Sequence, residues 1–421
     1  MSELPIDNHV FQRCQIPISF EVLDDQNWNE CTTLSLADRY SARVRAAYNL
    51  EWNLPQDYRN INAYDRCITI PPKIPYYKEP NQDTLFPSRL PNQRIPQPEY
   101  TSLLPLLIAA GRNDINIGQY NIISERNSLR KIAMNNENYV VGLQKFGSTL
   151  FLRRYDRRIV DMNDFGHRFE QMCTPDYHLK ANYYQLIEGR FGNLTMLITA
   201  ETDAICKRNG EAIELKCRSN LDIPKEIMRQ YWLQAFLGEV TTIVVGHRSN
   251  DRPLRLIGNV QNHKVVDMID NEEKNKILNR LYQILHFLSA QVLENEVYLF
   301  SRRIDQQTAK RQLYLYKVAR QDKQQLAFIS PRMRDTLFSN NEKAERQISM
   351  KHKNREMKNV TIGIDTGDSD DDVMSLNEES SDSIYEEDLF GESRFLKMNR
   401  MKEAKRRNVS LRYSEKSATM D

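Results

Sequence analysis

Two short segments on either side of Asn209-Gly210 constrain the fold of this 421-residue chain more than any other feature. Residues 200–205 and 212–217 are both typical of β-strands, since apolar residues lead into the first and Ile213 and Leu215 lie in the second. Asn-Gly between two such runs is the strongest short signal of a β-hairpin, because both residues accept a positive φ in a type I′ turn. The sequence therefore predicts that a two-residue loop joins these strands.

The predicted register sets Asp203 opposite Lys216 and Ile205 opposite Glu214. Side chains alternate between the two faces of a strand, so four charged residues would share one face: Glu201, Asp203, Glu214 and Lys216. A loop longer by an even number of residues would preserve that shared face. Three carboxylates and an ammonium group so close together suit Mg²⁺ or Mn²⁺, whereas zinc would require Cys or His. The alternative is a solvated strand face with one cross-strand Asp–Lys pair.

Composition and charge narrow the class of protein. The formal net charge of +2 predicts neither a nucleic-acid coat nor a membrane-binding surface, so any basic patch must be local. The six cysteines show no C-x-x-C or zinc-site spacing, which indicates reduced thiols in the cytosol or nucleus. The N-terminus is polar, and no apolar run approaches transmembrane length. We therefore expect an intracellular, soluble protein that does not bind membranes.

Periodicity predicts a mixture of helices and strands along residues 1–335. Helices are expected at 36–48, 103–110, 121–133, 162–173, 222–237 and 271–294. Strands are expected at 17–22, in a hairpin over 139–155, and at 241–245, 254–260, 297–303 and 312–318. Prolines recur over 71–98, which indicates an extended loop laid over a core. We interpret residues 1–335 as one catalytic domain.

The composition changes near residue 335. Residues 336–421 contain few apolar side chains, and an acidic stretch at 365–388 is followed by a basic one at 397–407. Such a segment cannot bury enough surface to offset its ordering entropy, so we predict a disordered acidic and basic tail. Its serines are candidates for phosphorylation, and Lys405-Arg406-Arg407 is a candidate nuclear localisation element. A merely solvated tail is an equal alternative.

Three further features accompany the hairpin, and each is weak by itself. Glu170 ends Gly166-His167-Arg168-Phe169-Glu170, and Arg126 begins a predicted helix. Gln234 lies in a mostly apolar helix, where a buried amide needs partners that a phosphate could supply. The alternatives are a solvated glutamate and a glutamine bonded to backbone or water.

Six motifs in a fixed order give the chain a specific resemblance. They are Arg126, G-x-x-F-E at 166–170, E-x-D at 201–203, E-x-K at 214–216, Y-W-x-Q-x-F-L at 231–237 and the segment 243–248. In this order and spacing, the chain resembles the DXO decapping exoribonuclease family. The resemblance covers residues 120–250 by motif and 15–335 by the order of elements. It implies an α/β (α+β) fold with mixed central β-sheets flanked by helices and an active site like that of E-x-K nucleases.

The resemblance also implies an activity. Members of this family remove incomplete guanosine caps and NAD caps from RNA 5′ ends. Many also act on 5′-phosphorylated RNA as pyrophosphohydrolases or as 5′→3′ exoribonucleases. The family includes nuclear partners of the large 5′→3′ exoribonuclease. For this chain we therefore expect action on RNA 5′ ends in RNA quality control, a nuclear location with the cytoplasm as an alternative, and an exoribonuclease as a candidate partner.

Roles for individual residues follow from the resemblance. Mg²⁺ or Mn²⁺ would be held by three carboxylates and one backbone carbonyl, those of Glu170, Asp203, Glu214 and Leu215. The phosphates of the RNA 5′ end would be held by Arg126, Lys216 and Gln234. Glu201 would act partly through a metal-bound water and partly on the substrate, and would form the catalytic group with Lys216 and Gln234.

The chain departs from the family pattern around the arginine motif. The family commonly has Trp-Arg-Gly there, whereas this chain has Glu125-Arg126-Asn127. We expect the acidic neighbour to weaken attraction for phosphate. The helix expected at 103–110 also lacks the acidic substrate contact of relatives and has Ala109 and Ala110 instead. These departures leave the metal chemistry intact and alter the RNA-holding surface.

Two other readings remain open. A catalytically weakened scaffold could bind and protect RNA 5′ ends, as the divergent insect member Cutoff does, and the tail of this chain could bind proteins. Retention of every metal-site side chain argues against this reading, because unneeded acids crowded together repel one another. A DNA nuclease of the wider E-x-K class is a third reading, and the arginine motif and the Trp-Gln helix argue against it.

Overall fold

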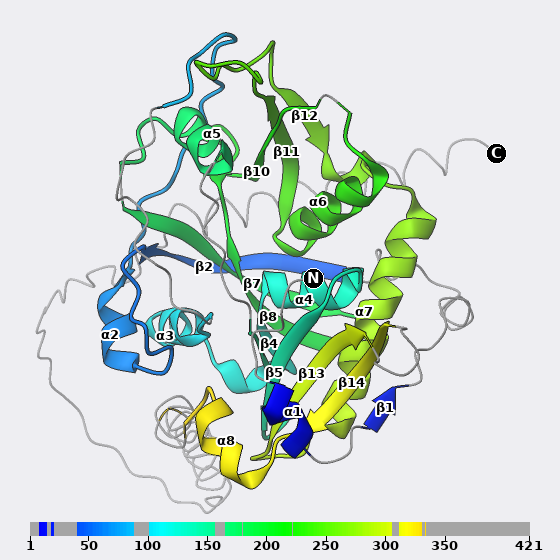
Figure 1. The fold of residues 1–421 in the computed structure, drawn as a ribbon. Coiled ribbons are helices and arrows are strands. Elements are labelled where there is room, and N and C mark those ends of the chain that lie inside the picture. Colours follow the sequence, from blue (N-terminus) through cyan, green and yellow to red (C-terminus); the bar gives the residue numbers. More distant parts are fainter. Residues whose placement is uncertain are drawn as a thin grey trace, which may run out of the picture. The chain divides into compact units, whose positions relative to one another are not determined.

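A ten-stranded mixed sheet forms the larger part of the fold in a computed structural model, which describes residues 8–14, 18–20, 40–87, 101–155, 165–178, 180–220, 222–304, 311–330 and 333 (Figure 1). Its strand order is β1 (Ile18–Phe20), β14 (Arg311–Lys317), β13 (Val297–Ile304), β5 (Tyr139–Phe146), β6 (Thr149–Arg154), β4 (Ile122–Glu125), β8 (Leu194–Glu201), β7 (Ala181–Phe191), β2 (Tyr40–Glu51) and β3 (Ile68–Thr69). Strand β4 runs parallel to both of its neighbours, and the other pairs are antiparallel.

A second, four-stranded sheet carries the E-x-K segment. Its order is β12 (Gln261–Lys264), β11 (Val240–His247), β10 (Ala212–Arg218) and β9 (Ala204–Ile205). Strands β10 and β11 are parallel, and helix α6 (Lys225–Leu237) connects them. A crossover helix packs back onto its own sheet, so α6 lies mainly against β11 and brings Gln234 to Glu214 on β10.

The other helices cover both sheets. They are α1 (Asn8–Arg13), α2 (Ile61–Arg66), α3 (Leu104–Arg112), α4 (Arg126–Met134), α5 (Phe165–Cys173), α7 (Asn271–Gln291) and α8 (Arg320–Leu326), with 3₁₀ turns η2 (Ile117–Gln119) and η3 (Val265–Asp267). One core joins the sheets through α4, α6 and α7, with Leu129, Trp232 and Leu281 fully buried. Helix α3 covers the opposite face of the large sheet, and α5 covers the small sheet. Among the described helices, none is both long and apolar enough to cross a membrane.

Most of the predicted elements are present. The mixed fold class is confirmed, as are the hairpin over 139–155, the helices at 103–110, 222–237 and 271–294, and the strands at 297–303 and 312–318. Pro224 caps α6 and Gly238 ends it, as the sequence predicts. The cysteines in the described part are free thiols: Cys14, Cys67, Cys173, Cys206 and Cys217. Residues 88–98 and the predicted tail at 336–421 lie outside the described residues.

The predicted helix at 36–48 is wrong, because residues 40–51 form β2. Its alanines and arginines favour a helix by intrinsic propensity. The segment instead pairs with β7 in antiparallel register from Tyr40 to Glu51, with one bulge between Val44 and Ala46. Strand propensity depends on packing against neighbouring strands, so this pairing overrides the local preference.

Three other strands also differ from the prediction. Residues 122–125 form β4 rather than the first turn of a helix, since Ile122 and Ile123 are fully buried between parallel neighbours. A short apolar run cannot be assigned to helix or strand by periodicity alone. Strand β7 was not predicted, although Gly192-Asn193 makes the two-residue loop that joins it to β8. The strand expected at 254–260 is wrong, since Arg255 and Leu256 form only isolated bridges and the strand that pairs with β11 is the later β12.

Candidate active site

The predicted first strand of the hairpin is divided between the two sheets. Strand β8 ends at Glu201 in the large sheet, and β9 begins at Ala204 in the small one. Asp203 lies between them, and its Oδ2 accepts a hydrogen bond from the Leu215 backbone N–H at 2.8 Å. The break therefore attaches one acid of the E-x-D motif to each sheet, a feature that a continuous hairpin would not produce.

The predicted two-residue loop is also wrong. Cys206 N donates to the Glu211 carbonyl oxygen at 2.8 Å, and Ile205 pairs with Ala212, so four residues form the loop. Gly210 has a φ of +70°, but Asn209 does not share its positive φ, so the turn is not type I′. The loop is two residues longer than predicted. A change of register by an even number of residues keeps Glu214 and Lys216 on the face that was predicted to be shared with the first strand.

The Glu214 carboxylate is the centre of a buried hydrogen-bond network. Its Oε1 accepts from Lys216 Nζ and Gln234 Nε2, both at 2.5 Å, and its Oε2 accepts from Arg126 Nη1 at 3.0 Å. The side chains of Glu214 and Arg126 are only 1% and 6% exposed. The structure thus brings four predicted site residues together from β10, α6 and the start of α4.

Charge interactions within the site shift several pKa values. Burial, and then Glu214 and Glu170, raise the pKa of Asp203 well above its ordinary value, and nearby Lys216 opposes the increase. Burial also acts to raise the pKa of Glu214, but Lys216 and Arg126 outweigh it and lower that pKa. Burial acts to lower the pKa of Lys216, and Glu214 and Asp203 raise it. Glu170, Asp203 and Glu214 therefore lie near enough to interact as charges.

Helix α5 is held against the small sheet by a close approach at Gly246. A Cβ atom at Gly246 would lie 2.2 Å from the Phe169 ring, so only glycine leaves space for this aromatic side chain. Phe169 is fully buried, and Glu170 follows it on the same helix. The Glu170 Oε2 atom lies 3.0 Å from His167 Nδ1. The phenylalanine of G-x-x-F-E thus anchors the helix that presents the glutamate.

Glu201 lies at the junction of two clefts. The larger spans about 810 Å³, open solvent included, and is lined by Arg126, whereas the smaller spans about 500 Å³ and is lined by Glu170 and Asp203. Both are also lined by Trp52, Asn182 and Glu201. Glu201 accepts hydrogen bonds from Asn182 Nδ2 at 2.5 Å and Tyr184 OH at 3.4 Å. Sequence reasoning did not find Trp52, Asn182 or Tyr184, because they come from strands and loops that it left unassigned.

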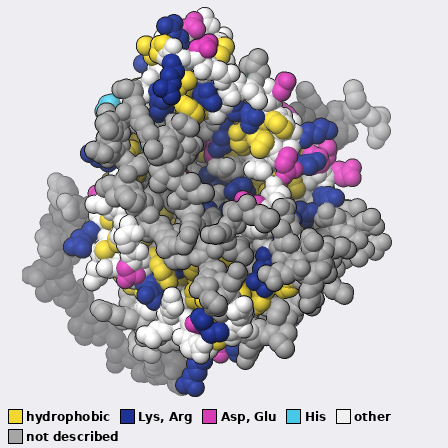
Figure 2. Space-filling view, in the orientation of Figure 1, with side chains coloured by type: hydrophobic (Ala, Val, Ile, Leu, Met, Phe, Trp, Pro, Cys, Tyr) yellow, Lys and Arg dark blue, Asp and Glu magenta, His cyan; other side chains and the backbone are white. Residues whose placement is uncertain are grey.

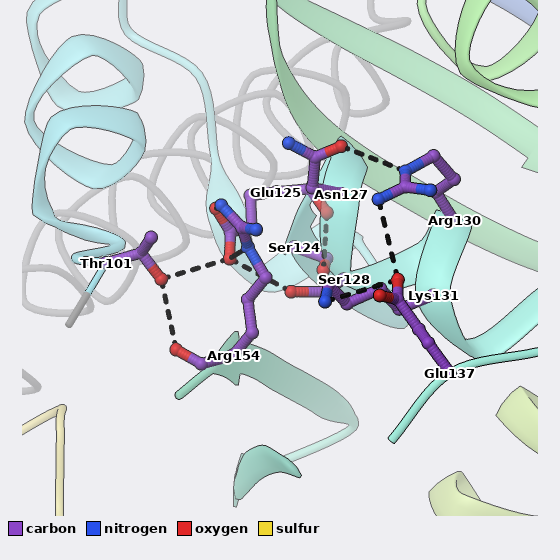
Figure 3. A network of polar contacts seen from close by, with 9 residues as sticks. All are labelled: Thr101, Ser124, Glu125, Asn127, Ser128, Arg130, Lys131, Glu137 and Arg154. Carbon is purple, nitrogen blue, oxygen red and sulfur yellow. Dashed lines mark hydrogen bonds and ion pairs between the residues drawn. The ribbon is translucent and has the colours of Figure 1, made fainter. Parts of the chain in front are cut away.

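A second polar network lies beside Arg126 on the large-sheet side (Figure 3). Glu125 Oε1 accepts from Arg154 Nε at 2.7 Å, and its Oε2 lies 3.3 Å from Arg154 Nη2. The Ser128 and Thr101 hydroxyls lie 3.1 Å from Oε1. The acidic neighbour of Arg126 is therefore compensated by an arginine, which removes the reason for expecting it to weaken phosphate attraction. Sequence reasoning did not find Arg154, because no local signal links it to Glu125.

The donor set fits a hard divalent cation in its chemistry. Three mutually repelling carboxylates and a backbone carbonyl are oxygen ligands of the type that Mg²⁺ and Mn²⁺ prefer. Burial, and then repulsion by Glu214 and Glu170, raise the pKa of Asp203, and a bound cation would relieve that repulsion. Within the described residues, no group of three or more His, Cys, Asp or Glu side chains is arranged to hold a metal ion. The acids lie near one another without forming a closed cage.

Figure 2 shows Lys and Arg on one face, interspersed among the described side chains with acidic, apolar and neutral ones. The formal net charge of the chain is nearly balanced at +2. Arg126 and Lys216 are cations placed inside the site, where both contact Glu214.

Comparisons with known proteins place this arrangement in a nuclease class. The family described as RAI1-like PD-(D/E)XK nuclease matches residues 76–334, more than half of the chain. This chain belongs to that family. Its fold and its E-x-K strand agree with the PD-(D/E)XK class. In the comparison with curated proteins, no protein matches this chain.

Solved structures show the same fold at low sequence identity. S. pombe Rai1 in complex with 3′-FADP is 16% identical, with a TM-score of 0.56 over 72% of this chain and 100% of that chain. Scheffersomyces stipitis Rai1 in complex with (3′-NADP)+ and calcium is 15% identical, with a TM-score of 0.51 over 70% and 93%. Candida albicans Rai1 in complex with pU5 and Mn²⁺ is 16% identical, with a TM-score of 0.51 over 72% and 97%.

Proposed function

We propose that this protein is a divalent-metal-dependent hydrolase of RNA 5′ ends. The observation that carries the proposal is the network in which Arg126, Lys216 and Gln234 meet at Glu214, beside the cleft that contains Glu201. Phosphate hydrolysis by a metal ion requires hydrogen-bond donors for the phosphate and carboxylates for the metal. The two cations and the amide supply the donors, and the acid cluster supplies the carboxylates. Membership in the RAI1-like nuclease family supports it.

The residues divide into two groups by role. Glu170, Asp203, Glu214 and the Leu215 carbonyl would hold Mg²⁺ or Mn²⁺, which would supply an activated water and stabilise the leaving oxygen. Arg126, Lys216 and Gln234 would turn toward the phosphates of the substrate, because guanidinium, ammonium and amide groups all donate hydrogen bonds. Glu201 would orient water and substrate from the junction of the two clefts.

The proposed substrates are RNAs with incomplete guanosine, NAD or triphosphate 5′ ends, with 5′→3′ exoribonuclease activity on 5′-monophosphate RNA as an extension. Related Rai1 structures contain 3′-FADP, (3′-NADP)+ or pU5, which are nucleotides of this general class. We further propose a role in RNA quality control in the nucleus, with the cytoplasm as an alternative location. A nuclear 5′→3′ exoribonuclease is the proposed partner, and residues 336–421 would bind proteins.

The test is hydrolysis by the purified full chain of RNAs labelled at the 5′ end. The RNAs would carry triphosphate, monophosphate, unmethylated guanosine cap or NAD, in Mn²⁺ or in EDTA. We expect metal-dependent release of a cap or 5′ nucleotide, lost in Glu214→Ala and retained in Asp322→Asn. Asp322 on α8 pairs with Arg13 on α1, and neither residue lines either cleft. Asp322→Asn therefore controls for the loss of an ion pair. Equal activity in Glu214→Ala and wild type would contradict the assigned site.

A scaffold that binds and protects RNA 5′ ends is the second candidate. It is favoured by one observation: both oxygens of Glu214 already accept hydrogen bonds from Arg126, Lys216 and Gln234. A carboxylate held this way must exchange partners before it can bind a cation. RNA binding without release of any 5′ group, in Mn²⁺ as in EDTA, would support the scaffold over the enzyme.

A further inference from the structure

The larger cleft contains an ion pair that the proposed reaction does not use. Glu125 and Arg154 both line it, together with Arg126, and their side chains are 15% and 10% exposed. Glu125 is the last residue of β4, and Arg154 is the last residue of the adjacent parallel strand β6. The pair is thus built on two rigid strands directly beside the proposed phosphate-binding arginine.

The Glu125 carboxylate is fixed but retains an exchangeable partner. Arg154 contacts both of its oxygens, and the Ser128 hydroxyl holds Oε1 from the first turn of α4 (Figure 3). The Thr101 hydroxyl lies 3.1 Å from two acceptors, Glu125 Oε1 and the Arg154 carbonyl oxygen. A hydroxyl has one hydrogen, so Thr101 can turn to the carbonyl when a ligand donates to Glu125.

Aromatic side chains form part of the wall of the same cleft. Tyr48 and Tyr184 both line it and stack with ring centroids 5.3 Å apart and an interplanar angle of 10°. Trp52 lines it as well, and its Nε1 donates to Asn182 Oδ1. Aromatic walls with a few fixed polar groups are typical of pockets that hold a nucleoside.

Charge balance is compatible with phosphate beside the pair. A single acid next to Arg126 would repel a phosphate, but the guanidinium of Arg154 neutralises Glu125 in place. Phosphate at Arg126 would leave the attached nucleoside within the same cleft, because Glu125, Arg126 and Arg154 all line it. The carboxylate can then accept a hydrogen bond, while the Glu125–Arg154 pair as a whole adds no net charge to that wall of the cleft.

We propose that the Glu125–Arg154 pair determines specificity by accepting a hydrogen bond from the 5′-terminal nucleoside of the RNA. The donor is a base N–H or the ribose 2′-hydroxyl. The inference rests on the proposed function in that the ligand is an RNA 5′ end. It adds a nucleoside-recognition role to a cleft wall that otherwise only borders the phosphate site.

Binding in the absence of metal tests the inference independently of hydrolysis. The probes are short 5′-monophosphorylated RNAs that begin with guanosine, purine riboside or 2′-deoxyguanosine, measured by fluorescence anisotropy in EDTA. Purine riboside lacks base N–H donors, and 2′-deoxyguanosine lacks the ribose donor. We expect wild type to bind guanosine RNA about 10- to 100-fold more tightly than one of these analogues, since hydrogen bonds to charged groups contribute this much.

Two variants should lower the preference while keeping binding to the phosphates. Glu125→Gln keeps an acceptor oxygen but removes the charge at constant shape, so it should weaken the preference, and the double variant should abolish it. The double variant Glu125→Leu/Arg154→Met replaces the whole pair with apolar groups, which buried ion pairs often tolerate without loss of stability. Asp322→Asn disrupts a comparable two-contact arginine–carboxylate pair outside the cleft and should keep the wild-type preference.

The possible results separate the two proposals. Equal affinity of wild type for the three RNAs, or a preference unchanged in both pair variants, would overturn the inference. A guanosine preference that Glu125→Gln weakens and the double variant loses would support it, even if no RNA is hydrolysed in Mn²⁺. In that last case the hydrolase proposal would fail while the recognition role would stand.

Discussion

Two carboxylates neighbour Arg126, Glu214 through an ion pair and Glu125 as the preceding residue, and their surroundings differ. Glu214 comes from the small sheet, is 1% exposed, and accepts from Arg126, Lys216 and Gln234. Glu125 comes from the large sheet, is 15% exposed, and is compensated by Arg154. Asp203 lies near Glu214, and its pKa is raised first by burial and then by Glu214 and Glu170, whereas Lys216 and Arg126 lower the pKa of Glu214 itself. Hydroxyl groups and one arginine surround Glu125.

The difference indicates which carboxylate can exchange its partners for a cation. A cation at Glu214 would relieve the repulsion that Glu214 and Glu170 exert on Asp203, so its binding would be favoured by more than one carboxylate. At Glu125 a cation would have to displace Arg154 without such a gain. Burial by itself therefore does not identify a metal ligand, and the number of nearby acids distinguishes the two sites.

The largest expected effect is on metal binding. We expect Glu214→Gln to weaken Mn²⁺ binding by more than about a hundredfold, because loss of an outer-shell partner alone costs about 10- to 100-fold. Glu125→Gln should leave Mn²⁺ affinity unchanged within a few-fold. Isothermal titration calorimetry on the full chain measures both affinities without any RNA.

A second variant guards against misfolding of Glu214→Gln, which leaves Arg126 and Lys216 without a carboxylate. Asp203→Asn removes a proposed ligand and keeps the acceptor oxygen for the Leu215 N–H. It should also weaken Mn²⁺ binding. Equal Mn²⁺ affinity in wild type, Asp203→Asn and Glu125→Gln would remove the distinction between the two regions.

The next effect concerns α5, the helix that brings Glu170 near Asp203. In Gly246→Ala the new Cβ would meet the Phe169 ring at 2.2 Å, so the helix or the ring must move. Overpacking of a well-packed core typically costs about 1–3 kcal/mol, and we expect a loss of stability in this range. Urea unfolding measures it. Gly111→Ala is the control, since nothing lies within 4 Å of its added Cβ.

A smaller effect isolates the Arg126–Glu214 contact. The Cβ atom in Gly238→Ala would lie 2.7 Å from Arg126 Nη1, the end of a flexible side chain. We expect Arg126 to shift away from Glu214, with little loss of stability because Gly238 has a φ of −89°. RNA affinity should fall by about two- to tenfold, the value of one typical hydrogen bond. Unchanged RNA affinity would mean that Arg126 does not contact the phosphate.

The smallest effect comes from a carboxylate outside both networks. A hydrogen bond from Lys323, and then its charge, lower the pKa of Glu296 below its ordinary value of 4.5, with Lys317 contributing as well. A depressed carboxylate pKa stabilises the fold above the unfolded-state pKa, and this contribution is lost as the pH falls through the folded-state value. Glu296→Gln should therefore reduce stability slightly at pH 7 and flatten its decline below about pH 4.5. Thermal unfolding against pH measures this, and an unchanged acid profile would contradict it.

Local signals in the sequence predicted several elements of the site correctly. Pro224 and Gly238 mark the start and the end of α6, and the spacing of Ile277, Leu281 and Leu288 identified the buried face of α7. Helix caps and helical periodicity both depend on residues that are close in sequence. The alternation along β10 put Glu214 and Lys216 on one face, and the structure has them in contact. These features could be predicted because each depends on residues a few positions apart.

The tertiary structure decided the features that depend on distant residues. It split the E-x-D motif between two sheets, because β8 pairs with β7 and β4 whereas β9 pairs with β10. It also joined Glu125 to Arg154, 29 positions later, and Arg126 to Glu214, 88 positions later. Pairing of strands and burial of charge are properties of the assembled sheets, so no local pattern in the chain encodes them.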